Sequence, residues 1–108
     1  MTKFPYWRSE PYRRWVASLP CIACGLEGYS QCAHSNQAKH GKGLGVKASD
    51  EFTFPLCAQH FGRIGCHTWH DLLEDMTHEE RDEIEDRYIA KTWAAAAEHG
   101  WHDKRARA

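Results

Sequence analysis

Two stretches decide the fold of this chain: Cys21-Ile22-Ala23-Cys24-Gly25 and Pro55-Leu56-Cys57-Ala58-Gln59-His60. Each carries two zinc-type ligands a few residues apart, and a tetrahedral zinc site is commonly assembled from two such pairs. The spacing therefore predicts a structural zinc ion held by Cys21, Cys24, Cys57 and His60. Cys66 is the alternative fourth ligand, and in that arrangement His60 is released for other work.

The composition restricts the class of protein. A chain of 108 residues forms one domain, small enough for its core to need a staple such as a metal ion. Five cysteines would leave one thiol over in a pure disulfide framework, and their spacing indicates metal binding in a reducing compartment. The start does not resemble a signal segment, and no apolar run could span a bilayer. We therefore expect a cytoplasmic protein with no membrane partner.

Charge is distributed unevenly along the chain, although the net charge is only -1. Residues 1–49 carry seven Lys and Arg against two acidic residues, whereas residues 50–108 carry seven against thirteen. The basic half could face a phosphate backbone, and ordinary solvated surface is the alternative of equal weight. Residues 35–49 form a glycine-rich segment, here called the basic loop, and its three lysines are the candidate nucleic-acid-binding residues: Lys39, Lys42 and Lys47.

Helical spacing, capping residues and β-prone runs outline the secondary structure. Ser9 can cap a short helix, on which Tyr12, Trp15, Val16 and Leu19 share one face. Residues 29–34 and 51–56 have the composition of short strands, and residues 66–73 can be helical.

A long helix is predicted over residues 78–98. Thr77 and Glu80 have the spacing of a capping box at its start, and Gly100 is a natural stop. Its predicted apolar face consists of Ile84, Tyr88, Ile89 and Trp93. The chain then divides into an arm with a short helix (1–20), a zinc-stabilised core (21–76), and a helix with a basic tail (77–108).

His34 follows the first predicted strand and precedes the basic loop. A histidine is the natural general base at neutral pH, and for phosphodiester hydrolysis it would deprotonate a water. A divalent metal would stabilise the developing charge, and His67, His70 and Asp71 are its candidate ligands because they share a helix face. Asp50 could orient His34 or contact the metal. Taken singly, each histidine is more often structural than catalytic.

Taken in order, several segments resemble small phage and prophage HNH-type nucleases of the ββα-metal superfamily, above all the recombination-associated, RecA-dependent nuclease group. The matching segments are Leu19-Pro20-Cys21-Ile22-Ala23-Cys24-Gly25, Cys32-Ala33-His34, residues 41–50, Phe54-Pro55-Leu56-Cys57-Ala58-Gln59-His60 and Gly65-Cys66-His67. They cover about half of the chain. The combination in this order is fairly specific, although no segment is specific alone.

The resemblance implies an α+β fold with a small ββα-metal (HNH-like) core, a structural zinc and flanking helices. It implies a metal-dependent DNA endonuclease with His34 as the catalytic base and Asp50 as a residue that steadies the site. A catalytic divalent cation, magnesium or manganese, would lie against the helix after the second strand. DNA is the implied partner, together with a recombinase filament in phage recombination.

One position departs from the pattern of these nucleases. The histidine that binds the catalytic metal in relatives is replaced here by Phe61, which cannot ligate a metal. Either His67 supplies that ligand, or catalysis has been lost. We favour His67, because Asp71 lies four residues later, where a second helical ligand is expected. The rival functions are a non-catalytic zinc module that binds nucleic acid and a protein-interaction domain that docks through the acidic helix.

Overall fold

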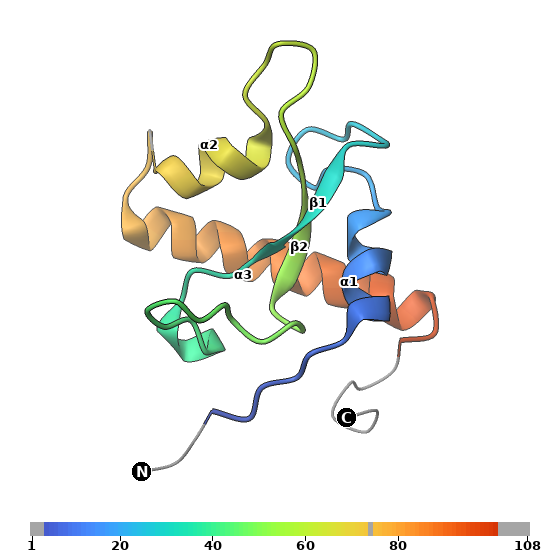
Figure 1. The fold of residues 1–108 in the computed structure, drawn as a ribbon, viewed down its shortest axis with the longest axis vertical. Helices are drawn as coiled ribbons and strands as arrows, with labels where there is room; N and C mark the ends of the chain where they lie inside the picture. The colour runs from blue at the N-terminus through green and yellow to red at the C-terminus, as the bar shows by residue number, and fades with distance from the viewer. Residues whose placement is uncertain (1–3, 74, 102–108) are drawn as a thin grey trace.

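Two antiparallel strands form the centre of the molecule in the computed structural model, which describes residues 4–73 and 75–101. The sequence predicts two strands and three helices, and all five are present, so the α+β class is confirmed. The predicted basic tail 104–108 lies outside the described residues. In chain order the elements are α1 (Glu10–Ala17), β1 (Ser30–His34), the short 3-10 helix η1 (Ala38–His40), β2 (Thr53–Cys57), α2 (Cys66–Leu72) and α3 (His78–Glu98) (Figure 1).

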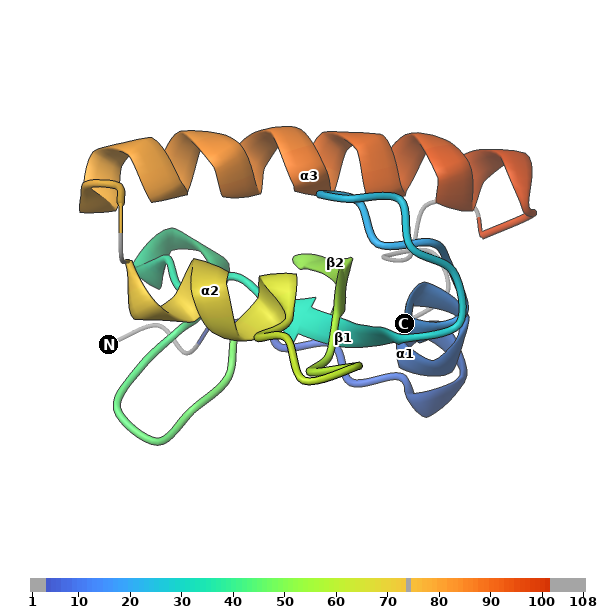
Figure 2. The same cartoon turned by 90° about the horizontal axis from the view of Figure 1, so that it is seen from above.

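The sheet consists of β1 and β2, with Ser30 paired with Cys57 at one end and His34 with Thr53 at the other. Every residue of β2 is buried, because α1, α2 and α3 all pack against this strand. Figure 2 shows α3 running along one side of the molecule, with the strands, α1 and α2 on the other side. A two-stranded sheet is marginal in water by itself, so packing against the helices is needed to stabilise it.

The N-terminal arm, α1 and α3 share one apolar cluster. Ser9 caps α1 by accepting a hydrogen bond from the Tyr12 amide at 3.2 Å, as predicted. Tyr12 and Val16 are buried, and Trp7 of the arm packs against Tyr12. Ala96 of α3 completes this cluster. A second cluster between the sheet and α3 consists of Cys21, Ala33, Phe54, Leu56, Cys57 and Ile89.

Helix α3 begins and ends where the sequence predicts, and its buried face is partly the predicted one, since Ile89 is buried and Tyr88 packs against the core. The Thr77–Glu80 capping box is formed. The prediction assigned Trp93 to the apolar face, yet 44% of its surface is exposed. The buried side of α3 differs from the prediction because polar side chains from other segments bind Glu85 there. That buried stripe consists of Arg81, Glu85, Ile89, Thr92 and Ala96.

Across the described residues, no helix combines the length and the apolar character that crossing a bilayer requires.

Candidate metal centre and active site

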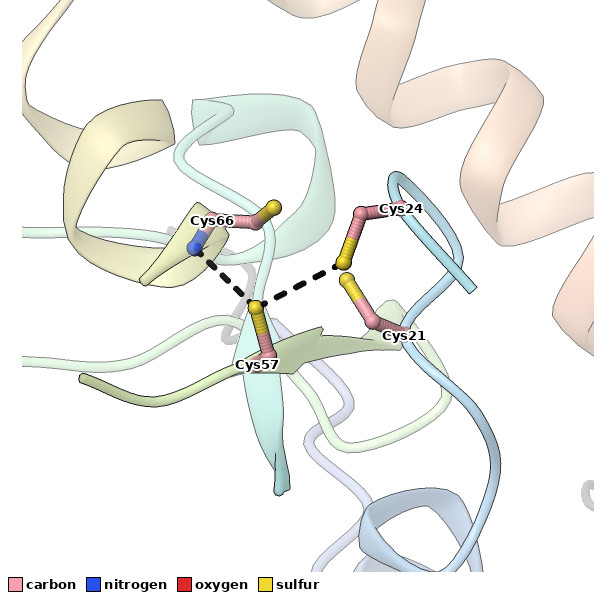
Figure 3. Close-up of side chains that lie close together, drawn as sticks. All are labelled: Cys21, Cys24, Cys57 and Cys66. Carbon is pink, nitrogen blue, oxygen red and sulfur yellow. Dashed lines mark hydrogen bonds between the residues drawn. The ribbon is translucent and has the colours of Figure 1, made fainter. Parts of the chain in front are cut away.

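Four cysteines from three segments converge on one point (Figure 3). Cys21 and Cys24 come from the turn before β1, Cys57 ends β2, and Cys66 begins α2. Their sulfur atoms all lie within 4.8 Å of one another, and the sulfurs of Cys24 and Cys57 are 3.8 Å apart. Thiolates about 2.3 Å from a tetrahedral zinc ion are separated by about 3.8 Å. The donor set and its spacing therefore fit a structural zinc ion.

Local backbone geometry brings these sulfurs together. The Gly25 amide donates to the Cys21 carbonyl at 2.8 Å and closes the first turn. The Cys66 amide donates to the Cys57 sulfur at 3.3 Å. A Cβ atom at Gly65 would lie 2.3 Å from the Cys57 carbonyl oxygen, so only glycine lets α2 begin this close to the end of β2. Burial and the neighbouring thiols raise the pKa of Cys66, and a bound cation would offset that penalty.

The preference for His60 over Cys66 as the fourth ligand is wrong. His60 and Arg63 pair across a tight turn whose two central residues, Phe61 and Gly62, have positive φ angles. Among the described residues, the ligand atoms that converge are those of Cys21, Cys24, Cys57 and Cys66, and His60 is not one of them. The His60 ring instead packs against Tyr29, with 5.2 Å between ring centroids.

A cavity of about 210 Å³ opens between the end of β1, the basic loop and α2. It brings together five residues that were predicted from separate parts of the sequence: His34, Lys42, Lys47, His67 and Asp71. Lys39, the third candidate lysine, instead pairs with Asp86 of α3 at 3.1 Å. The full lining is Cys32, His34, Ser35, Asn36, Lys42, Lys47, His67 and Asp71.

His34 is held by Asp50, as one of the two predicted roles for Asp50 requires. The distance from Nε2 of His34 to Oδ1 of Asp50 is 2.9 Å, and only 1% of the Asp50 side chain is exposed. Asp50 also accepts hydrogen bonds from the Ser9 amide, Arg8 and Arg13. Burial acts to raise the pKa of Asp50, but the hydrogen bonds from His34, Ser9 and Arg13 lower it to about 2. The ionised carboxylate therefore fixes the orientation of the imidazole ring.

His67 and Asp71 both line the cavity, and each has a side-chain atom of a type that can ligate a metal. Nε2 of His67 lies 3.5 Å from Oδ2 of Asp71. Nδ1 of His67 lies 2.8 Å from the side-chain oxygen of Gln31, which can only accept, so Nδ1 carries the proton and Nε2 keeps its lone pair. Asn36 donates to the other oxygen of Asp71 at 3.4 Å. Burial lowers the pKa of His67 although Asp71 opposes this, which favours the neutral ring that a metal needs.

Gln31 contacts His67 and Asn36 contacts Asp71 through their side chains, and no sequence pattern predicts either contact. Gln31 is 36 residues before its partner His67, and no spacing rule connects them. Asn36 lies two residues after His34, so its proximity to His34 is the one signal that could have identified it.

His70, the third predicted cation ligand, faces away from the cavity. Its Nε2 atom lies 2.8 Å from Oε2 of Glu85 on α3, and both side chains are buried. Glu85 also accepts hydrogen bonds from Ser35, Asn36 and Gln37. Glu85 thus ties α2 and the segment after β1 to α3. His70 and Asp71 lie three and four residues after His67, so helical spacing allows either of them to neighbour it. The contact between His70 and Glu85 is the reason that Asp71 lies beside His67 at the cavity and His70 does not.

The ionised Glu85 carboxylate is expected to make the free energy of unfolding depend on pH. Burial acts to raise its pKa, but hydrogen bonds from His70 and Asn36 lower it from 4.5 to about 2. Since the folded-state pKa is depressed, the stabilisation is present above pH 4.5 and is lost as pH falls toward about 2. We expect Glu85→Gln to reduce the free energy of unfolding at pH 7 by about 3 kcal/mol. Urea denaturation at several pH values measures the difference.

The exposed acid Glu83 on the same helix provides the control, and Glu83→Gln should be neutral. The difference in the free energy of unfolding between the wild type and Glu85→Gln should become smaller as the pH falls below 4.5. A Glu85→Gln variant that unfolds at the same urea concentration as the wild type at pH 7 would show that the Glu85 charge does not stabilise the fold.

Comparison with known proteins identifies a family but no activity. The family described as "Protein of unknown function (DUF968)" matches residues 2–88. A protein of Escherichia coli strain K12, "Uncharacterized protein YdfU", is 37% identical over 70 residues, which cover 64% of this chain and 19% of that protein. The chain thus spans about a fifth of the relative that it matches. No solved structure matches the chain.

Proposed function

This chain belongs to the DUF968 family, and we propose that it is a metal-dependent DNA endonuclease of the HNH (ββα-metal) type. One observation carries the proposal. His34 at the end of β1 and His67 with Asp71 on α2 line the same cavity, beside a four-cysteine cluster that joins the strands to α2. The order of two antiparallel strands followed by a short helix is that of a ββα-metal core.

In this proposal His34 is the general base. The ionised Asp50 can only accept a hydrogen bond, so Nε2 of His34 donates to it and Nδ1 keeps the lone pair. Nδ1 is then the atom that takes a proton from the attacking water. Asp50 holds the ring in one tautomer and stabilises the positive charge that proton transfer creates.

His67 and Asp71 are the residues that would hold a catalytic divalent cation. Magnesium or manganese bound there would stabilise the charge that develops on the phosphate and the leaving oxygen. Two protein ligands are sufficient for such a cation, because its other positions are filled by water and substrate phosphate. His67 would thus take over the role that Phe61 cannot perform, and Phe61 is 79% exposed.

Electrostatics support a nucleic-acid substrate at this cavity. Lys42 and Lys47 line it, and the loop that carries them projects away from α3 (Figure 2). α3 carries acidic residues along its first half, so a polyanion would approach the opposite side of the molecule. A recombinase filament as a further partner is supported only by the resemblance to the phage nucleases.

The test of this proposal is a nicking assay on supercoiled and single-stranded circular DNA. We expect zinc-loaded wild-type protein to nick DNA when magnesium or manganese is added. The assay is run both without and with a recombinase filament, and nicking in either condition supports the proposal. His67→Ala should lower the rate by about 100-fold or more, since even the outer-shell partners of metal ligands are worth up to about 100-fold. His78→Ala, at the exposed start of α3, is the matched control and should nick normally.

A non-catalytic zinc module that binds nucleic acid is the second candidate. One observation favours it: within residues 4–73 and 75–101, the four cysteines are the one group of three or more ligating side chains that converge. DNA binding by the zinc-loaded protein, without nicking under any metal or filament condition, would exclude the nuclease and support this module.

A further inference from the structure

The basic loop has an apolar tip that the fold does not use. Gly43 and Val46 pair across a tight turn, each amide donating to the other residue's carbonyl at 3.0 and 3.1 Å. Gly45 takes the left-handed φ of 70° that the turn needs. Leu44 stands at the tip with a relative exposure of 104%, so its side chain is surrounded by solvent. A leucine in this position contributes nothing to the core.

The N-terminal arm anchors both ends of this loop. The Tyr6 hydroxyl donates to the Gly41 carbonyl at 2.5 Å. Arg8 donates to the carbonyls of Lys47 and Ala48 at 2.7 and 2.5 Å. A Cβ atom at Gly41 would lie 2.8 Å from the ring of Tyr6, so arm and loop are in close contact. Hydrogen bonds from the arm therefore hold both ends of the loop that carries Leu44.

Two cations flank the apolar tip and also line the proposed active site. Lys42 and Lys47 lie on the two sides of the turn, and both border the cavity that contains His34 and His67. Figure 2 shows the loop, in green, projecting on the side opposite α3. The same two lysines therefore border both the apolar tip and the cavity.

We propose that Leu44 is a wedge that inserts between neighbouring bases of DNA bound at this cavity, while Lys42 and Lys47 contact the flanking phosphates. This inference rests on the proposed function. Nucleic acid is the occupant that fits, because it combines phosphates for the lysines with an apolar space between stacked bases. Proteins that open base steps in this way use an apolar side chain beside basic residues. The wedge assigns duplex DNA, locally unstacked near the cut, as the substrate.

The experiment measures DNA binding and base unstacking separately. Zinc-loaded protein without added magnesium or manganese is bound to a fluorescent DNA duplex, and affinity is read from anisotropy. Unstacking is read from the permanganate reactivity of thymines along the same duplex. The variants are Leu44→Ser, which removes the wedge, and Leu44→Phe, which keeps an apolar tip. Because Leu44 is fully exposed, both variants should melt at the temperature of the wild type.

We expect wild type and Leu44→Phe to make thymines several-fold more reactive. Leu44→Ser should still bind through the lysines but should lose this reactivity. If Leu44→Ser unstacks DNA as the wild type does, or if the wild type binds without unstacking, the wedge is overturned while the nuclease proposal stands. If the wild type does not bind the duplex, the wedge is overturned as well, and the nicking assay on supercoiled and single-stranded circular DNA decides the nuclease proposal separately.

Discussion

Stripping zinc from the loaded protein with a chelator is expected to unfold most of the domain. The cluster connects the turn before β1, the end of β2 and the start of α2, and these segments frame a sheet of only two strands. Structural zinc sites contribute about 10–16 kcal/mol, which is comparable with the whole stability of a typical domain, about 5–15 kcal/mol. Far-UV circular dichroism before and after chelation, with metal analysis of the protein, measures the effect.

Substitutions identify the fourth ligand in the same assay. Cys66→Ser should lose zinc and most of the helical signal, because it removes a ligand from the cluster. His60→Ala should retain one zinc per chain, because His60 lies outside it. Cys32→Ser is the matched control, since this cysteine is also outside the cluster. A chelated sample that keeps its full helical signal would remove the structural-metal conclusion, and loss of zinc in His60→Ala would restore His60 as a ligand.

Replacement of His34 by alanine is expected to slow nicking strongly without unfolding the protein. General-base catalysis contributes about 100-fold to 10,000-fold, so the rate should fall by that factor. The fold should persist because Asp50 keeps its hydrogen bonds from Arg8, Arg13 and the Ser9 amide when the imidazole is removed. The nicking assay, with thermal melting of the same samples, measures both parts of this prediction.

Asp50→Asn tests the proposed role of Asp50 in orienting His34. It keeps the shape of the side chain but removes the charge that holds the His34 ring, so we expect slower nicking and a lower melting temperature, because Arg8 and Arg13 lose their ion-pair partner. Cleavage by His34→Ala at the wild-type rate would eliminate His34 as the base, whatever the effect of Asp50→Asn.

Features governed by neighbours in the chain could be predicted from the sequence. Helix α3 begins at the Thr77–Glu80 capping box and ends before Gly100, because capping depends on residues within one turn. The Cys21–Cys24 pair forms a turn closed by its own backbone, so its spacing alone indicated a metal half-site. The positions of both strands followed from short β-prone runs in the same way.

Choices between neighbouring residues depended on distant parts of the chain. Cys66 joins the cluster in place of His60 because the turn at Phe61 and Gly62 and the close approach at Gly65 decide where the chain returns to β2. His70 turns from the cavity because Glu85, fifteen residues later on α3, binds it. The same carboxylate replaces the predicted apolar face of α3 with a partly polar one.

The sequence by itself thus determined the helices and strands and the types of side chain that could ligate a metal, because both depend on local propensity and spacing. Only the tertiary structure decided which ligands meet. Gln31 contacts His67, and Asn36 contacts Asp71, across separations that no helical or strand period relates. These contacts arise when the sheet, α2 and α3 pack together, since packing fixes the directions of side chains that the local sequence leaves free.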